Sequence, residues 1–551
     1  MYKWDSYMER GIGMKKTAFI KEDSILILCL FLLLLTGCSK KNGSIYGPPL
    51  VVSPQVVSRY EEGVEAGFRI LNSGGNAFDA FVGVTALENV ISPGAVSLSG
   101  VLGTLVYHAE SNTVTFLDAG YNSVLALGGE YDPNDPVLGK AVAVPGIVAG
   151  LREVHRRYGR LSWAEVLQPA IELARRGFTV SEGYALSLEI YAQILQRTEY
   201  GRQTFFPGDL PLQPGDTLRL PELENFLTDL AEQGSSYMYT GQWAEQCVDT
   251  IQAEGGLMTM EDLASYRPTW GEPWAMTYRG YDICASSGRV LHCLWALLAL
   301  KTLEHTNIQP MGHFSESADA LEVMVRTARA VDEESWIWNA VFQEDRDLVN
   351  SRLTWNYTNT IWDKVEAALG NVSSSVPTDH HTLCSIVVDR EGNVVAAKHS
   401  INSEFWGSGL FVQGIPLNAS AMLAYTWNGP GKRRLQGVGN FLIFKEGKMR
   451  SALGMYDRDG QYAAFQFLVN LIDFDFPADM AAELPRFGGY VYDENGIVDY
   501  STHWLNESIS QVIVDALRER GLFFEQVDFV HGVGCMLKFH LDGTTSTGWG
   551  R

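Results

Sequence analysis

"HHTLCSIVVDREGN", residues 380–393, is the stretch that decides the fold. From Thr382 onward the residues are mostly apolar and β-branched, which is typical of a strand. The sequence "DREGN" at 389–393 then has the composition of a turn. Before Thr382, the lead "PTDHH" is polar and poor in strand formers. The predicted strand therefore begins abruptly at Thr382.

A threonine in this place has a specific chemical use if it becomes the first residue of a chain. Its hydroxyl is a poor nucleophile until a base removes the proton, and a free α-amine on the same residue is such a base. The pKa of an α-amine lies near neutrality, which suits that role. Cleavage of the bond between His381 and Thr382 would create it. Taken alone, the layout is more typical of an ordinary threonine at a strand edge.

The first part of the chain combines helices with a hairpin. Its 551 residues allow two to four ordinary domains or one large layered domain, and 46% hydrophobic residues is a globular composition. Residues 60–90 predict two helices joined by a glycine turn at Gly74 and Gly75. Residues 103–118 predict two strands joined by a hairpin turn. The patterns from 145 to about 300 are mostly helical.

Strand patterns dominate after Thr382, and one helical stretch at 463–484 interrupts them. Strands followed by a helix pair, after a first half that also offers a hairpin and helices, suggest a layered α/β sandwich. We therefore expect an α/β sandwich in which helices cover both faces of stacked sheets.

Several function classes are disfavoured by composition and missing motifs. The formal net charge of -23 argues against a nucleic-acid partner, because phosphate binding needs basic patches. No phosphate-binding glycine loop, nucleophile-elbow serine or zinc-protease motif occurs. The five cysteines after residue 38 show neither metal spacing nor a redox pair. The sequence thus predicts no cofactor and no metal.

The N-terminal residues predict a lipoprotein signal peptide over 1–38. Two lysines precede the apolar run 25–35, which is too short to span a bilayer but suits a signal sequence. The run ends in "LTGC", which resembles the bacterial lipobox, so Cys38 is the predicted lipid anchor. Residues 39–50 are a predicted tether. We expect a bacterial cell-envelope protein, periplasmic or on the cell surface, whose start codon is Met1 or Met14.

Several motifs together resemble the gamma-glutamyltransferase family of N-terminal nucleophile hydrolases. That family opens its small subunit with a threonine, a strand, "VVD-x-DGN" and a second strand that ends in "T-x-N". Here these elements are Thr382, "IVVDREGN" and "HSIN" at 399–402. Further similar segments, spread over almost everything after residue 51, are 72–90, 140–182, 250–268, "YRGYDIC", "LPRF" and the terminal "GWGR".

The resemblance implies a four-layer αββα sandwich and a precursor that cleaves itself. Residues 51–381 would form the large subunit and 382–551 the small subunit, which together make one globular heterodimer. Thr382 would be the nucleophile for self-cleavage and for acyl transfer. Ser400 occupies the place of a family threonine whose hydroxyl bonds the nucleophile, and Asn402 takes the place of an asparagine that holds substrate.

Departures from the family concentrate where the acyl donor binds. The family's carboxylate-binding arginine is replaced in "LDAGYN" by Gly120 or Tyr121, and its amine-binding aspartate is missing from "LNASAMLAY". Its tandem serines become Gln436 and Gly437, and its glycine-rich oxyanion loop becomes "GMYDRD" at 454–459. The remaining candidates are main-chain oxyanion donors at Asp457 and Arg458, and substrate contacts at Asn418, Gln436, Gly437 and Gly454.

Three functions follow from this combination of retained and lost motifs. The first is an amide hydrolase and acyl transferase that uses Thr382 through an acyl-enzyme, with a small peptide or amide substrate that is not γ-glutamyl. The second is a true gamma-glutamyltranspeptidase, or glutathione hydrolase, with a rearranged pocket. The third is a non-catalytic binding or scaffold lipoprotein that keeps the fold.

Overall fold

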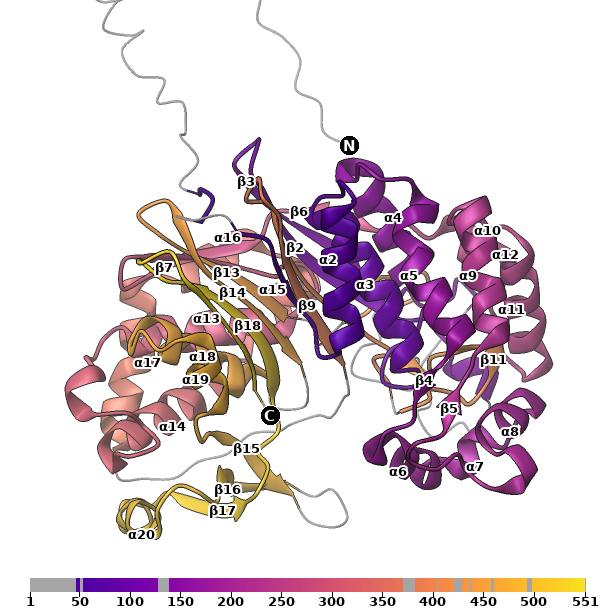
Figure 1. Cartoon of the computed structure of the whole chain (residues 1–551). Coiled ribbons are helices and arrows are strands. Elements are labelled where there is room, and N and C mark those ends of the chain that lie inside the picture. The colour runs from indigo at the N-terminus through magenta and orange to yellow at the C-terminus, as the bar shows by residue number, and fades with distance from the viewer. Residues whose placement is uncertain are drawn as a thin grey trace, which may run out of the picture. The chain divides into compact units, whose positions relative to one another are not determined.

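The computed structural model describes residues 46–49, 53–126, 138–369, 382–403, 405–420, 429–435, 437, 439–456, 460–492 and 498–550. Its centre is two antiparallel six-stranded sheets that lie face to face (Figure 1). The first sheet has the strand order β1 (Gln55–Val57), β9 (Leu383–Val388), β10 (Val394–Ser400), β2 (Val101–His108), β3 (Thr113–Ala119) and β6 (Thr269–Gly271).

The second sheet has the order β19 (Thr545–Trp549), β18 (Val533–Phe539), β14 (Lys448–Tyr456), β13 (Gly439–Lys445), β8 (Tyr281–Ala285) and β7 (Trp274–Tyr278). The strands β9, β10 and β2 of the first sheet pack on β13, β14 and β18 of the second. Smaller sheets are formed by β15 (Phe487–Tyr492), β16 (Val498–Asn506) and β17 (Phe523–Val527), by β11 (Phe411–Val412) with β12 (Ile415–Pro416), and by β4 (Phe178–Thr179) with β5 (Thr217–Leu218).

Helices cover the outer face of each large sheet (Figure 1). Helices α3 (Ala77–Ile91) and α4 (Ile147–Tyr158) contact the first sheet. Beside or beyond them lie α2 (Glu61–Asn72), α5 (Trp163–Arg176), α6 (Glu182–Ile190), α7 (Ala192–Leu195), α8 (Glu199–Phe205), α9 (Pro221–Gln233), α10 (Ser236–Tyr239), α11 (Gln242–Ala253) and α12 (Met260–Ser265).

Helices α13 (Leu291–Leu303), α18 (Gly460–Ile472) and α19 (Ala478–Glu483) contact the second sheet, together with or beside α14 (Ala318–Asp332), α15 (Trp336–Gln343), α16 (Arg346–Arg352), α17 (Trp355–Ala368) and α20 (Gln511–Glu519). One apolar core fills the space between the sheets and beneath α13 and α18, and a second lies between the first sheet and its helices. The predicted αββα sandwich is confirmed.

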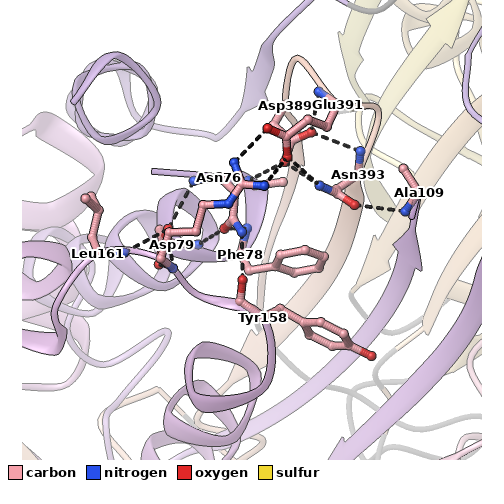
Figure 2. A network of polar contacts seen from close by, with 11 residues as sticks. Asn76, Phe78, Asp79, Ala109, Tyr158, Leu161, Asp389, Glu391 and Asn393 are labelled. Carbon is pink, nitrogen blue, oxygen red and sulfur yellow. Dashed lines mark hydrogen bonds and ion pairs between the residues drawn. The ribbon is translucent and has the colours of Figure 1, made fainter. Parts of the chain in front are cut away.

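The predicted turn "DREGN" fixes the β9–β10 hairpin through the polar network in Figure 2. The Asp389 carboxylate accepts hydrogen bonds from the main-chain N–H of Ala77, at 3.0 Å, and from the Asn393 side chain, at 2.7 Å. Asn393 accepts in turn from the Ala109 N–H at 2.8 Å, in the β2–β3 turn. The network thus ties the hairpin to the start of α3 and to the neighbouring hairpin, which holds the register of all four strands.

Residues 269–285 depart from the predicted mostly helical region, because they form β6, β7 and β8. The burial of Trp274–Tyr278 alternates residue by residue, which is the signature of a half-buried strand. The segment is short and lies between long helical patterns, so the alternation is easily overlooked. These strands place part of the first half of the chain in the second sheet.

Candidate functional site

Thr382 lies directly before β9, an inner strand of the first sheet that packs on the second sheet. It is 4% exposed. Cys384, Ile386 and Val388, which share its position in the strand alternation, all belong to the core between the sheets. Because side chains two residues apart on a strand point the same way, Thr382 also faces the space between the sheets.

Ser400, the last residue of β10, is the cross-strand neighbour of Thr382. The ladder pairs His399 with Leu383, and the next pair along the hairpin joins these two residues. The hydroxyl oxygens Thr382 Oγ1 and Ser400 Oγ are 2.9 Å apart, and Ser400 is completely buried. The register of one hairpin thus brings the two predicted residues together.

Asn402, the third predicted catalytic residue, contacts Ser400 through its main chain. Its φ of 46° lies in the left-handed region, which asparagine tolerates better than most residues. In this conformation the Asn402 main-chain N–H donates to Ser400 Oγ at 2.7 Å. One lone pair of the serine is thereby occupied, which orients the hydroxyl that faces Thr382.

Two other predicted site residues, Asn418 and Gly454, make contacts that support the fold. The Asn418 side chain accepts from the N–H groups of Ala143 and Ser420 and donates to the carbonyls of Ser99 and Ala143. All four hydrogen-bonding positions of its amide are therefore used by the main chain in this structure. Gly454 lies inside β14, where a Cβ atom would come within 2.9 Å of Cys384 Cβ, so this glycine allows the two sheets to approach.

Gly437 lies beside His292 at the start of α13, since a Cβ on this glycine would be 3.5 Å from His292 Cε1. The predicted residues Cys38, His381, Gln436, Asp457 and Arg458 lie outside the described residues. Within the described part of the chain, no three His, Cys, Asp or Glu side chains gather as metal ligands. No helix among the described residues is both long and apolar enough to cross a membrane.

Comparison with known proteins decides the family. The family model described as gamma-glutamyltranspeptidase matches residues 63–546. The chain belongs to the gamma-glutamyltranspeptidase family. The Acylase ACY 1 proenzyme of Pseudomonas sp. (strain SE83) is 31% identical over 89% of this chain and 90% of its own length. The glutathione hydrolase proenzyme of Escherichia coli (strain K12) is 27% identical over 80% of this chain and 82% of its own.

A solved structure supports the fold. The crystal structure of cephalosporin acylase from Bacillus halodurans superposes with a TM-score of 0.74 over 91% of this chain and 94% of that one, at 22% identity. The predicted membership of the gamma-glutamyltranspeptidase family is therefore confirmed by sequence, and the predicted fold by structure.

Tyr121 is one of the two residues, with Gly120, that the resemblance sets in the place of a family arginine. It lies just after β3, near the place where the resemblance puts an arginine, and it is 1% exposed. Its hydroxyl donates to the carbonyl of Ile401 at 2.7 Å, between Ser400 and Asn402. Burial raises the pKa of this phenol well above its usual value, so it stays a neutral donor. Tyr121 thus supports the backbone between Ser400 and Asn402.

A buried acid and a histidine lie behind Ser400, and sequence reasoning missed both. Glu88 on α3 and His399 on β10 are fully buried, with Glu88 Oε2 3.4 Å from His399 Nε2. Ser58 Oγ donates to Glu88 Oε1 at 2.6 Å. Burial raises the Glu88 pKa to about 8 and lowers the His399 pKa to about 3. Both side chains are therefore neutral in the folded protein near pH 7.

Replacing Glu88 with glutamine is expected to flatten the pH dependence of stability above pH 6.5. There the unfolded chain has lost the Glu88 proton while the folded chain keeps it up to about pH 8, so stability falls as the pH rises. The lowered pKa of His399 makes stability rise with pH, but only below pH 6.5, the ordinary pKa of a histidine. Between pH 6.5 and 8 the free energy of unfolding should fall by about 2 kcal/mol more in the natural protein than in the glutamine variant.

The measurement is urea unfolding of both proteins at pH 6.5 and pH 8. Glutamine keeps an acceptor for Ser58 and gains a donor toward His399, so the variant should fold. If the free energy of unfolding fell equally in the two proteins, Glu88 would be ionised in the folded state.

Proposed function

We propose that this chain is an amide hydrolase and acyl transferase that cleaves itself before Thr382 and then uses that residue as its N-terminal nucleophile. The observation that carries the proposal is the buried pair of hydroxyls, Thr382 and Ser400, 2.9 Å apart at the paired ends of β9 and β10. Family membership supplies the context. The names of both curated relatives, which are called proenzymes, support processing of a precursor into two subunits.

Self-cleavage would start with attack of Thr382 Oγ1 on the carbonyl carbon of residue 381. The C–N bond to Thr382 breaks, an ester to the threonine oxygen forms, and the hydroxyl proton passes to the released amine. Water then hydrolyses the ester and frees the carboxyl group of residue 381. The product is a chain that begins at Thr382 and carries its own base, the α-amine.

Amide hydrolysis would repeat the same chemistry on a substrate. The α-amine takes the Thr382 proton as the oxygen attacks the substrate carbonyl, and the proton then moves to the departing amine. An acyl ester on Thr382 remains, and water or an acceptor amine releases it. The Ser400 hydroxyl, held by the Asn402 N–H, fixes the position of the attacking oxygen throughout.

A true glutathione hydrolase is the second candidate, and the similarity to the Escherichia coli enzyme favours it. The departures at Gly120, Tyr121, Gln436 and Gly437 favour a different acyl donor. The deciding experiment is N-terminal sequencing of the purified protein, followed by assay with γ-glutamyl p-nitroanilide. A chain that begins at Thr382 supports the enzyme. A chain that stays uncut after long incubation would favour the non-catalytic scaffold. A cut chain that does not hydrolyse the γ-glutamyl anilide would exclude the glutathione hydrolase.

We also propose that the protein is lipid-anchored in a bacterial cell envelope. The support is the sequence alone, namely the apolar run 25–35 followed by Cys38. The natural protein should partition into the membrane fraction and release into the soluble fraction when Cys38 is replaced by serine. Equal partitioning of the two proteins would contradict the anchor.

A further inference from the structure

Two buried cysteines lie in the core between the two large sheets. Cys384 is on β9, two residues after Thr382, and Cys535 is on β18 of the second sheet. Both side chains are completely buried in that core. Because the two residues are far apart in the sequence and belong to different sheets, only the fold brings them together.

Gly454 on β14 shows how near the two side chains come. In the antiparallel ladder of the second sheet, Gly454 is paired directly with Cys535, so the Cys535 side chain lies on the face to which a Cβ of Gly454 would point. A Cβ atom at Gly454 would be 2.9 Å from Cys384 Cβ and 3.1 Å from Cys535 Sγ. Both cysteines therefore border the space that this glycine leaves open.

The two thiol groups also interact with each other. Burial raises the pKa of the Cys384 thiol well above its usual value, and a hydrogen bond with the Cys535 thiol raises it further. Sheets that pack face to face are about 10 Å apart, whereas Cα atoms of β9 lie within 8 Å of Cα atoms of β18. A disulfide needs Cα atoms about 4.4–6.8 Å apart, and the close approach of the strands at Gly454 favours that separation.

We propose that Cys384 and Cys535 form a disulfide that joins the two sheets beside Thr382. This goes beyond the proposed amide hydrolase activity and does not depend on it. Because Cys384 is on the same strand face as Thr382, the bond would hold the start of β9 against β18. Both cysteines fall in residues 382–551, so the bond lies within one fragment of a cut chain and does not tie the two fragments together.

The bond would form by thiol–disulfide exchange with a small disulfide such as oxidised glutathione. The thiolate of one cysteine displaces a glutathione thiolate and forms a mixed disulfide, which the thiolate of the other cysteine then attacks. The two cysteines lose two electrons and two protons. The oxidised glutathione takes up both and becomes two molecules of reduced glutathione.

Burial sets the stage at which this exchange can occur. The thiolate is the reactive form, and the raised pKa of the Cys384 thiol keeps it protonated in the folded protein. Lys398, the cross-strand partner of Cys384, brings a positive charge to the same core, but its Nζ donates to the carbonyl of Gly437. The exchange therefore belongs to folding, before the two sheets close over the cysteines.

The test maps the cysteines of the natural chain after production in a host with an oxidising cytoplasm. The folded protein is denatured, its free thiols are alkylated at once, and a tryptic digest made without reductant is analysed by mass spectrometry. We expect peptide 521–538, which carries Cys535, to be linked to the peptide that carries Cys384 and ends at Arg390. Alkylation of both cysteines, or a link from either one to a different cysteine, would overturn the proposal.

The same digest reports self-cleavage separately. The peptide with Cys384 begins at Thr382 in a cut chain and at Val365 in an uncut chain, because Lys364 is the preceding site for trypsin. A linked peptide that begins at Val365 would support the disulfide and contradict the proposed function. An alkylated Cys384 in a peptide that begins at Thr382 would do the reverse.

Two variants and one comparison of stability complete the test. Cys535→Ser should leave Cys384 alkylated, while Cys247→Ser, which changes a buried cysteine on α11, should keep the link. The linked natural protein should melt roughly 5 °C higher than its thiol form from a reducing host, because a disulfide that closes a long loop restricts the unfolded chain strongly. Equal melting temperatures of the linked and thiol forms would contradict a bond that holds the sheets together.

Discussion

Replacing Thr382 with alanine is expected to leave a single uncut chain and to lower amide hydrolysis by at least about 10⁴-fold, the scale seen when a nucleophile is removed. Alanine has no oxygen to attack the carbonyl of residue 381, so neither the new chain end nor the α-amine base is formed. Because Thr382 is 4% exposed and its hydroxyl has one described partner, Ser400, the variant should fold. A denaturing gel and an anilide assay measure the two effects.

Thr382→Ser is the matched control, since it keeps the hydroxyl and removes only the methyl group. It should be cut at the same bond and retain measurable hydrolysis. A Thr382→Ala protein that still separates into fragments at residue 382, or that hydrolyses amides at the natural rate, would show that another group is the nucleophile.

Replacing Ser400 with alanine should slow self-cleavage and lower kcat by roughly 10²-fold, the cost of misplacing a reacting group. The change removes the hydroxyl that joins Thr382 Oγ1, at 2.9 Å, to the Asn402 N–H, at 2.7 Å. Without the Ser400 hydroxyl, Thr382 Oγ1 is still present but is no longer held in one orientation. The effect should therefore fall on kcat more than on KM.

Ser400→Thr restores the hydroxyl in the form that the gamma-glutamyltranspeptidase family resemblance assigns to this position. It should recover most of the cleavage and turnover lost in Ser400→Ala. Equal melting temperatures of the two variants would show that the loss of activity in Ser400→Ala does not come from a loss of stability. If alanine were as active as threonine, the serine would be a packing residue and the proposed positioning role would fall.

The hairpin that carries Thr382 and Ser400 was predictable because it depends on local rules. The turn residues Asp389 to Asn393 set its register, and the register alone places the two hydroxyls opposite each other. The helices on either side of Gly74 and the hairpin at 103–118 follow from equally local patterns. Strands β7 and β8 were missed, because their signal is short and their partners lie far along the chain.

The charged groups around the site could not be read from local patterns. Glu88 occurs in a helix that is apolar on almost every side, and its partner His399 lies more than three hundred residues later. Lys398 looks like an ordinary polar residue in a strand until both faces of β10 prove to be buried. The main-chain partners of Asn418 could not be read from its motif either, because Ser99 and Ala143 lie far away in the sequence.

Each of the two large sheets contains strands from both halves of this chain. Strands β9 and β10, from the later half, lie between β1 and β2 of the first sheet, while β7 and β8, from the earlier half, complete the edge of the second. Once the bond before Thr382 is cut, neither fragment can leave without opening a sheet. Unfolding would then release two separate molecules that must find each other again. The mature protein would accordingly owe its lifetime to the height of its unfolding barrier rather than to reversible refolding.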